Sequence, residues 1–210
     1  VLLITAVLIV GGALFFLMEE FDNPATLGDM PLWQKGLNAL FQSVTLRTAG
    51  FDSIGQGGLS DTSKAMSCVL MLIGGSSGST AGGLKTATVG VLLLGREQVT
   101  FRGRAIHYRR VLNAMTLALV VLFVFVFSSM VVSTVEDLPY LDSAFEVASA
   151  MGTVGLTTGI TPTLSPFPQG PLILLMYMGR VGILSFSIAF ITGNRHPAKI
   201  KYPEMNVMIG

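Results

Sequence analysis

The sequence predicts an all-α integral membrane protein made of two consecutive units, each with a helix, a re-entrant loop and a second helix. Three observations support this fold class. Of the 210 residues, 51% are apolar and 12% are charged, whereas an ordinary soluble domain carries about 25% charged residues. The apolar residues lie in long blocks with almost no charge. The sequence also matches itself at a constant offset of 105 residues.

Three apolar blocks are long enough to cross a bilayer as helices, which takes about 20 residues. They are residues 1–18, 111–135 and 171–191. The first two blocks carry no charge, and the third carries only Arg180. The first block lacks a basic start and a small-residue cleavage site, so we expect a span rather than a signal peptide.

A fourth span, residues 63–94, is interrupted by a segment of glycine, serine, threonine and one alanine at 74–83. The flanking half-helices, 63–73 and 84–94, would each be about 16 Å long, so the break falls near the middle of the membrane. Glycine and serine there weaken the helix. Non-helical backbone at that depth is tolerated only against protein or a water-filled cavity.

The charges orient the chain in the cell (inner) membrane. Residues 95–110 carry five arginines against one acid, and the tail after Ile191 carries three bases against one acid. Ten acids lie in segments 19–64 and 136–146, with only three bases. The positive-inside rule therefore places the arginine-rich connection and the C-terminus of this multi-pass protein in the cytoplasm.

The internal repeat defines two units. Its matches include Ala39 with Ala144 and Met71 with Met176. In each unit a half-length helix, 32–46 or 140–151, precedes a turn, RTAGFDS (47–53) or GTVGLTTG (152–159). These helices are too short to span. We expect a first unit (1–95), a connection (96–110), a second unit (111–193) and a tail (194–210).

The two turns have a chemistry that suits a cation. A helix that enters the membrane points its partly negative C-terminus at the membrane centre. Glycine adopts backbone angles that other residues resist, and carbonyls freed at such a turn can replace the hydration shell of an ion.

Several segments in order resemble the Trk/Ktr/HKT superfamily of potassium transporters, most closely the membrane subunit of the bacterial Ktr-type system. They are SVTLRTAGFDS (43–53), GGSSGSTAGGLKT (74–86), SAMGTVGLTTGITP (149–162) and YMGRVGILSF (177–186). The resemblance implies a pseudo-fourfold channel-like pore built from four helix–pore-loop–helix repeats, of which this chain would be the third and fourth. It implies potassium uptake through a selectivity filter.

Carried onto matching positions, the resemblance implies filter carbonyls at Thr48, Ala49, Gly50, Thr153, Val154 and Gly155. Phe51 and Leu156 would close each turn by packing, and Arg47 would brace the loop by hydrogen bonds.

The resemblance also implies that the interrupted span is a gate beneath the filter. The gating loop would comprise Gly74, Gly75, Ser76, Ser77, Gly78, Ser79, Thr80, Ala81, Gly82 and Gly83. A charge at membrane depth points to a function, and Arg180 is expected to form a positive barrier and to hold the loop shut. Lys85 either tunes the closed state or extends toward the interface.

The resemblance further implies a membrane homodimer, a cytoplasmic nucleotide-binding ring subunit and an N-terminal half of the same polypeptide holding repeats one and two. Potassium is the transported ion. Sodium as a coupling or activating ion stays open. We expect no nucleotide on this chain, no nucleic-acid partner and no transition metal. We also expect no enzyme activity, because no nucleophile–base pair shares a wet pocket.

The glycine-rich segment has two alternative interpretations. A phosphate loop requires lysine directly after the second glycine, but Leu84 separates Gly83 from Lys85. A broken-helix secondary transporter for another small solute, with Ser76, Ser77 and Ser79 at its substrate site, stays open.

Overall fold

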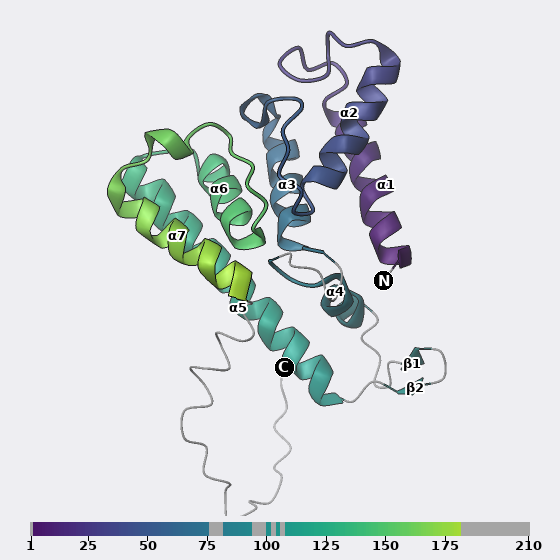
Figure 1. The fold of residues 1–210 in the computed structure, drawn as a ribbon, viewed down its shortest axis with the longest axis vertical. Coiled ribbons are helices and arrows are strands. Elements are labelled where there is room, and N and C mark those ends of the chain that lie inside the picture. Colours follow the sequence, from purple (N-terminus) through teal and green to yellow (C-terminus); the bar gives the residue numbers. More distant parts are fainter. Residues whose placement is uncertain (1, 76–81, 94–99, 102–103, 106–107, 182–210) are drawn as a thin grey trace, which may run out of the picture.

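The computed structural model describes residues 2–75, 82–93, 100–101, 104–105 and 108–181 (Figure 1). Within them, a long helix, a half-length helix, a short 3-10 helix and a further helix follow one another twice, and the first half has one additional helix, α4. The first half contains α1 (Leu2–Glu19), α2 (Leu32–Thr45), η1 (Gln56–Gly58), α3 (Asp61–Leu72) and α4 (Thr86–Leu93). The second half contains α5 (Tyr108–Glu136), α6 (Tyr140–Gly152), η2 (Thr161–Thr163) and α7 (Pro166–Val181). Between the halves, β1 (Thr100–Phe101) pairs with β2 (Arg104–Ala105) in an antiparallel ribbon.

The helices follow the predicted segments closely. Helices α2 and α6 agree with the predicted half-length helices to within one residue. The fourth predicted span is two separate helices, α3 and α4, interrupted between residues 73 and 85. Within the described residues, two helices are long and apolar enough to cross a membrane, Leu2–Glu19 and Ala114–Glu136.

The ends of some segments differ from expectation. Helix α5 begins at Tyr108, inside the expected connection, and α7 begins at Pro166, five residues before the expected span. Proline is compatible with the first turn of a helix, where its missing N–H has no intrahelical partner. Residues 182–191 of that expected span and the tail 194–210 lie outside the described residues.

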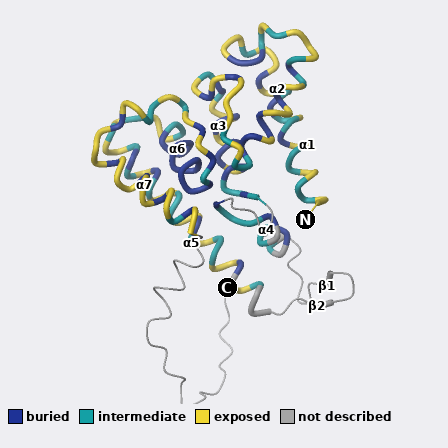
Figure 2. Tube along the Cα trace, viewed as in Figure 1, coloured by how far each residue is buried: buried dark blue, intermediate teal, exposed yellow. Residues whose placement is uncertain are grey.

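Helix α6 lies at the centre of the packing. It is flanked by α3, α5 and α7, and every residue from 143 to 152 is buried. Figure 2 shows this helix almost entirely in dark blue. The apolar cluster around Phe16 and Phe145 draws on both halves of the chain. The two halves therefore share this core. Burial of each such large side chain contributes about 1.5–3 kcal/mol to its stability.

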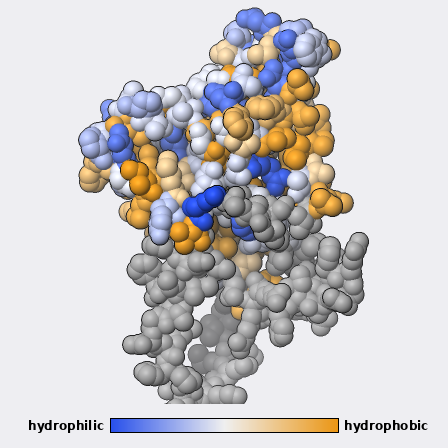
Figure 3. All heavy atoms as spheres, in the orientation of Figure 1, coloured by the Kyte–Doolittle hydropathy of each residue, from blue (hydrophilic) through white to orange (hydrophobic). Residues whose placement is uncertain are grey.

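Helix α2 matches α6 in the repeat but is buried on one side only. Its large apolar side chains Trp33, Leu37, Leu40 and Val44 are exposed, and their spacing puts them on one face. Figure 3 shows apolar atoms gathered along the side of the molecule where α1 and α2 lie. A contiguous exposed apolar face of this kind marks contact with lipid or with another protein segment.

Polar clamps hold the loops that follow the helices. The fully buried Glu20 carboxylate accepts hydrogen bonds from Asn23 (2.6 Å), Thr26 (2.6 Å) and the Ser60 N–H (3.0 Å). It therefore ties the end of α1 to the start of α3. The Lys64 ammonium lies 2.7 Å from the Asp142 carboxylate, which joins the first turn of α3 to the first turn of α6.

Candidate functional site

The turns after α2 and α6 have the same backbone conformation at matching positions. Thr48 and Gly50 have φ angles of 73° and 76°, and Thr153 and Gly155 have φ angles of 55° and 96°. The residue between each pair does not have a positive φ. Because positive and negative φ angles alternate along each turn, successive carbonyls point toward one side of the chain. A left-handed threonine is uncommon and costs energy, so its occurrence at both matching positions indicates a shared constraint.

A hydroxyl on each half-length helix holds its turn. The Thr45 hydroxyl donates to the Phe51 carbonyl (2.6 Å) and accepts from the Phe51 N–H (2.8 Å). In the second half, the Ser149 hydroxyl accepts from the Gly155 N–H at 3.1 Å. The two hydroxyls stand at different repeat positions, so the sequence repeat alone does not reveal them.

The two turns lie directly side by side. A β-carbon placed on Gly50 would collide with the carbonyl oxygen of Val154. Leu156 packs into the shared core with 4% of its surface exposed, as expected. Phe51 does not fulfil the matching expectation in this chain, because 70% of its surface is exposed. Leu156 has the first half to pack against, and Phe51 has no corresponding neighbour among the described residues.

The ends of segment 74–83 are drawn together beneath these turns. The Leu84 N–H donates to the Leu72 carbonyl (2.8 Å), and the Thr86 N–H donates to the Gly75 carbonyl (3.2 Å). A β-carbon on Gly74 would collide with the Gly82 carbonyl. The segment therefore leaves and rejoins the α3–α4 axis through one narrow neck. Residues 76–81, which include all three predicted loop serines, lie outside the described residues.

Each end of the neck contacts one of the two turns. The Gly82 N–H donates to the Thr153 hydroxyl at 3.1 Å. The Arg47 guanidinium donates to the Gly74 carbonyl (3.3 Å) and, more weakly, to the Thr5 carbonyl (3.5 Å). Arg47 thus lies between α1 and the neck, an arrangement compatible with the expected bracing. It also borders a cavity of about 300 Å³ that is lined by Thr48 and Gly75 as well.

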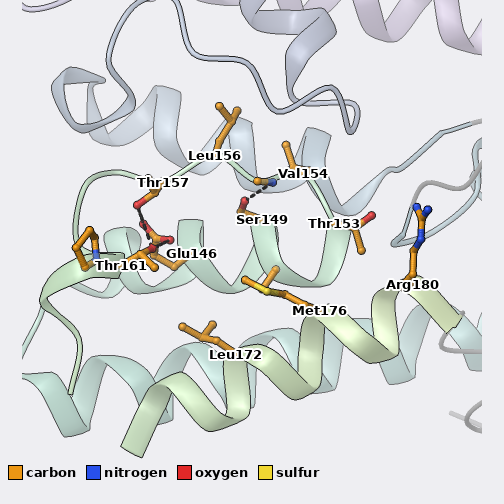
Figure 4. Close-up of a pocket in the computed structure, with 13 residues that line it drawn as sticks. Glu146, Ser149, Thr153, Val154, Leu156, Thr157, Thr161, Leu172, Met176 and Arg180 are labelled. Carbon is orange, nitrogen blue, oxygen red and sulfur yellow. Dashed lines mark hydrogen bonds between the residues drawn. The ribbon is translucent and has the colours of Figure 1, made fainter. Parts of the chain in front are cut away.

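A larger cavity of about 540 Å³ lies between α6, the second turn and α7. Thr153, Val154, Gly155 and Arg180 all border it. Figure 4 shows the Arg180 side chain rising from the end of α7 on the same side as Thr153. The structure therefore brings Arg180 close to the second turn. Lys85 follows the neck directly, one residue before α4.

One residue of this cavity was not singled out by the sequence. Glu146 on α6 is one of the ten acids in segments 19–64 and 136–146, yet only 5% of its surface is exposed. Its carboxylate accepts hydrogen bonds from the segment that follows the second turn. The available signal was a carboxylate in the middle of a helix whose residues after Asp142 are otherwise apolar or small, followed in the sequence by a threonine-rich segment.

Long apolar helices, two half-length helices and two left-handed turns side by side define a helical membrane protein with a channel-like fold. Residues 1–198 match the TrkH family, which is described as a cation transport protein family. The chain belongs to this family.

Individual relatives agree with this assignment. The chain is 43% identical to the potassium/sodium uptake protein NtpJ of Enterococcus hirae, over 99% of this chain and 48% of that protein. It is 36% identical to the Ktr system potassium uptake protein B of Bacillus subtilis, over 91% of this chain and 44% of that protein. The chain therefore spans about half the length of these relatives.

A solved structure shows the same fold. The potassium transporter TrkH from Vibrio parahaemolyticus superposes with a TM-score of 0.67 at 21% identity. The superposition covers 92% of this chain and 43% of the transporter.

Proposed function

We propose that this chain forms half of a potassium uptake pathway, and that the carbonyls of its two turns bind the ion. The observation that carries the proposal is the close contact between Gly50 and the Val154 carbonyl, which brings two turns of the same alternating conformation together. Carbonyl rings of this kind replace the hydration shell of a potassium ion. The ion-binding residues are Thr48, Ala49, Gly50, Thr153, Val154 and Gly155.

Segment 74–83 acts as the gate of this pathway. Its neck is hydrogen-bonded to both turns, through Arg47 and through Thr153, so it lies on the path of an ion that leaves them. Arg180 contributes a positive charge beside the same path, and Lys85 lies at the base of the segment. A polar neck with small residues suits a wet cavity and would be costly against lipid.

The remainder of the pore comes from a further part of the protein. Helix α3 covers one side of α6, but the corresponding apolar face of α2 is exposed. By the repeat, that face requires a helix equivalent to α3, supplied by an N-terminal half with repeats one and two. This chain then holds the third and fourth repeats.

The names of the relatives support a proposal for the assembly and the ions. Proteins named as parts of a Ktr system indicate a complex with further subunits, and we include a membrane homodimer and a cytoplasmic nucleotide-binding ring. The name of the Enterococcus relative includes sodium as well as potassium, so sodium is a candidate for a second transported or coupling ion. The arginine-rich connection and the C-terminus face the cytoplasm.

The proposal is tested by K⁺ and Na⁺ uptake of the full-length protein in transport-deficient cells, wild type against Gly155→Ser. Weakened preference for K⁺, with the variant still present in the membrane, supports the filter. Unchanged selectivity at equal membrane abundance overturns it. Uptake of an organic solute that depends on Ser76, Ser77 or Ser79 would instead support a secondary transporter.

A further inference from the structure

We infer that Glu146 is a positioning residue for the second turn, and that its carboxylate maintains the discrimination between K⁺ and Na⁺. This inference rests on the proposed filter. It concerns the outer side of the turn, where the chain leaves Gly155 and returns toward α7.

The Glu146 carboxylate is a buried hub for this outgoing segment. One oxygen accepts hydrogen bonds from the Thr157 hydroxyl (2.6 Å), the Thr158 N–H (2.9 Å) and the Thr158 hydroxyl (3.2 Å). The other oxygen accepts from the Thr161 hydroxyl (2.5 Å). Figure 4 shows Thr157 pointing down from the segment toward Glu146 on α6.

These bonds tether the segment at several places to a single side chain. Hydrogen bonds to an ionised carboxylate are shorter and about twice as strong as neutral ones. The Thr157 hydroxyl also accepts from the Gly159 N–H (2.9 Å) and lies 3.1 Å from the Thr161 hydroxyl. Movement of any one threonine would therefore disturb the bonds of the others.

Helix α6 thus holds the second turn through two residues that lie one helical turn apart. Ser149 holds Gly155 itself, and Glu146, one helical turn earlier, holds the segment beyond it. Ion selectivity depends on the number of coordinating carbonyls and on how firmly they are held. Release of the outgoing segment would leave Gly155 fixed on one side only.

The first half of the chain has a related hydrogen-bond network after its turn, made by different residues. On α2, Gln42 exchanges hydrogen bonds with Gln56 (2.5 and 3.1 Å), and Gln56 donates to Asp52 (2.8 Å). Asp52 and Gln56 match Thr157 and Thr161 in the repeat. Gln56 bonds α2 directly and Asp52 is joined to it through Gln56, so both outgoing segments are tied to the half-length helix through the same pair of repeat positions. Recurrence with unlike residues indicates that the geometry of the turn is what the tether serves.

The test compares variants of the full-length protein, purified and reconstituted in proteoliposomes, for K⁺ and Na⁺ flux and for thermal stability. Glu146→Ala removes the hub. Thr157→Val combined with Thr161→Val removes two hydroxyl donors and leaves the carboxylate in place. Thr163→Val is the matched control, because the exposed Thr163 hydroxyl bonds only the carbonyl of Ile160 in its own turn. Gly155→Ser reports on the filter itself.

We expect Glu146→Ala and the double threonine variant to lower the K⁺/Na⁺ selectivity ratio by about tenfold, and Thr163→Val to leave it unchanged. Glu146→Gln should lose less, because its one carbonyl oxygen still accepts from Thr157 and Thr158. A role limited to folding would lower thermal stability and leave the selectivity ratio of the surviving protein unaltered.

The controls separate this inference from the proposed function. Wild-type selectivity in both Glu146→Ala and the double threonine variant, with altered selectivity in Gly155→Ser, overturns the role of Glu146 alone. Wild-type selectivity in Gly155→Ser as well overturns the filter and this inference with it. Should Glu146→Ala fail to fold, the double threonine variant decides, because it keeps the carboxylate.

Discussion

The backbone N–H of Gly82 donates a hydrogen bond of 3.1 Å to the hydroxyl of Thr153. It joins the end of segment 74–83 to the first residue of the second turn, across 71 positions of sequence. A β-carbon on Gly82 would lie 2.6 Å from the Met151 carbonyl oxygen, so the neck is pressed against the end of α6. The gate and the filter of the proposed pathway therefore share a contact.

Removal of the Thr153 hydroxyl should loosen the gate. In Thr153→Val the Gly82 N–H loses its acceptor, which costs about 1 kcal/mol or more in the position that the structure shows. We expect basal K⁺ flux of the full-length protein, measured in proteoliposomes without cytoplasmic partners, to rise about fivefold.

Thr153→Ser is the control for this change, because it keeps a hydroxyl at the same place. It should retain low basal flux. If the valine and serine variants behave alike, the hydrogen bond from Gly82 does not hold the gate.

A comparison of Gly50→Ala with Gly155→Ala tests whether turns from further repeats complete the ring of carbonyls around the ion. Alanine at Gly50 meets the Val154 carbonyl and adopts a strained φ of 76°, so we expect K⁺ selectivity to be lost. A β-carbon placed on Gly155 would meet no atom within 4 Å among the described residues of this chain. Alanine there adds only backbone strain, about 1–2 kcal/mol, unless another turn lies beside it.

In the full-length protein we expect the two alanine variants to be equally damaging to the ratio of K⁺ to Na⁺ uptake. That result requires a carbonyl from another repeat beside Gly155. A Gly155→Ala variant with the wild-type ratio, beside a non-selective Gly50→Ala, would contradict the four-repeat ring.

The helices of this fold were predictable because their signals are local. Apolar blocks of span length gave α1 and α5, and the glycine-rich interruption separated α3 from α4. The repeat located both turns, and the structure gives them matching backbone angles at Thr48 and Thr153. The ribbon of β1 and β2 had no such signal, because two-residue strands are too short for alternation to be visible.

The contacts of the site were not predictable to the same degree. In the sequence Glu146 is one acid of the acid-rich segment 136–146. Its partners lie 11–15 residues further on in an irregular segment. The repeat also hides it, since its counterpart is the apolar Phe41. Phe51 and Leu156 occupy matching positions and yet differ in burial, because packing depends on which neighbouring unit is present.

The ion pair of Lys64 and Asp142 should stabilise the junction between the two halves. Their side chains are only 11% and 19% exposed and lie 2.7 Å apart. The exchange of Lys64 for methionine leaves the carboxylate without this partner, which we expect to cost about 1–3 kcal/mol. Thermal unfolding of the detergent-solubilised full-length protein measures the loss.

A double-mutant cycle isolates the pair itself. Lys64→Met combined with Asp142→Leu removes both charges and should recover part of the stability lost in Lys64→Met, because no unpaired charge remains. Additive losses in the two single variants would mean that the pair contributes no coupling.

The Glu20 clamp should make the junction of α1 and α3 sensitive to acid. Burial by itself raises the pKa of this carboxyl, but hydrogen bonds from Thr26, Ser60 and Asn23, together with the nearby Ser63 hydroxyl, outweigh it and lower the pKa below the ordinary 4.5. The folded state therefore holds the ionised form more tightly than the unfolded chain does. This contribution is present above the unfolded pKa and is lost as the pH falls through the lowered, folded pKa.

Glu20→Gln removes this linkage while it keeps the size of the side chain. We expect the variant to be less stable than wild type at neutral pH by about 2 kcal/mol, since bonds to a charged group are lost. The difference should shrink as the pH falls below 4.5 and through the lowered folded pKa, because the wild-type carboxyl then becomes neutral too. Thermal unfolding of both proteins across this range measures it.

The exposed Asp22, two residues away and outside the clamp, gives the matched control Asp22→Asn, which should follow the wild-type curve. A constant difference between Glu20→Gln and wild type at every pH would mean that the carboxylate contributes packing and no charge.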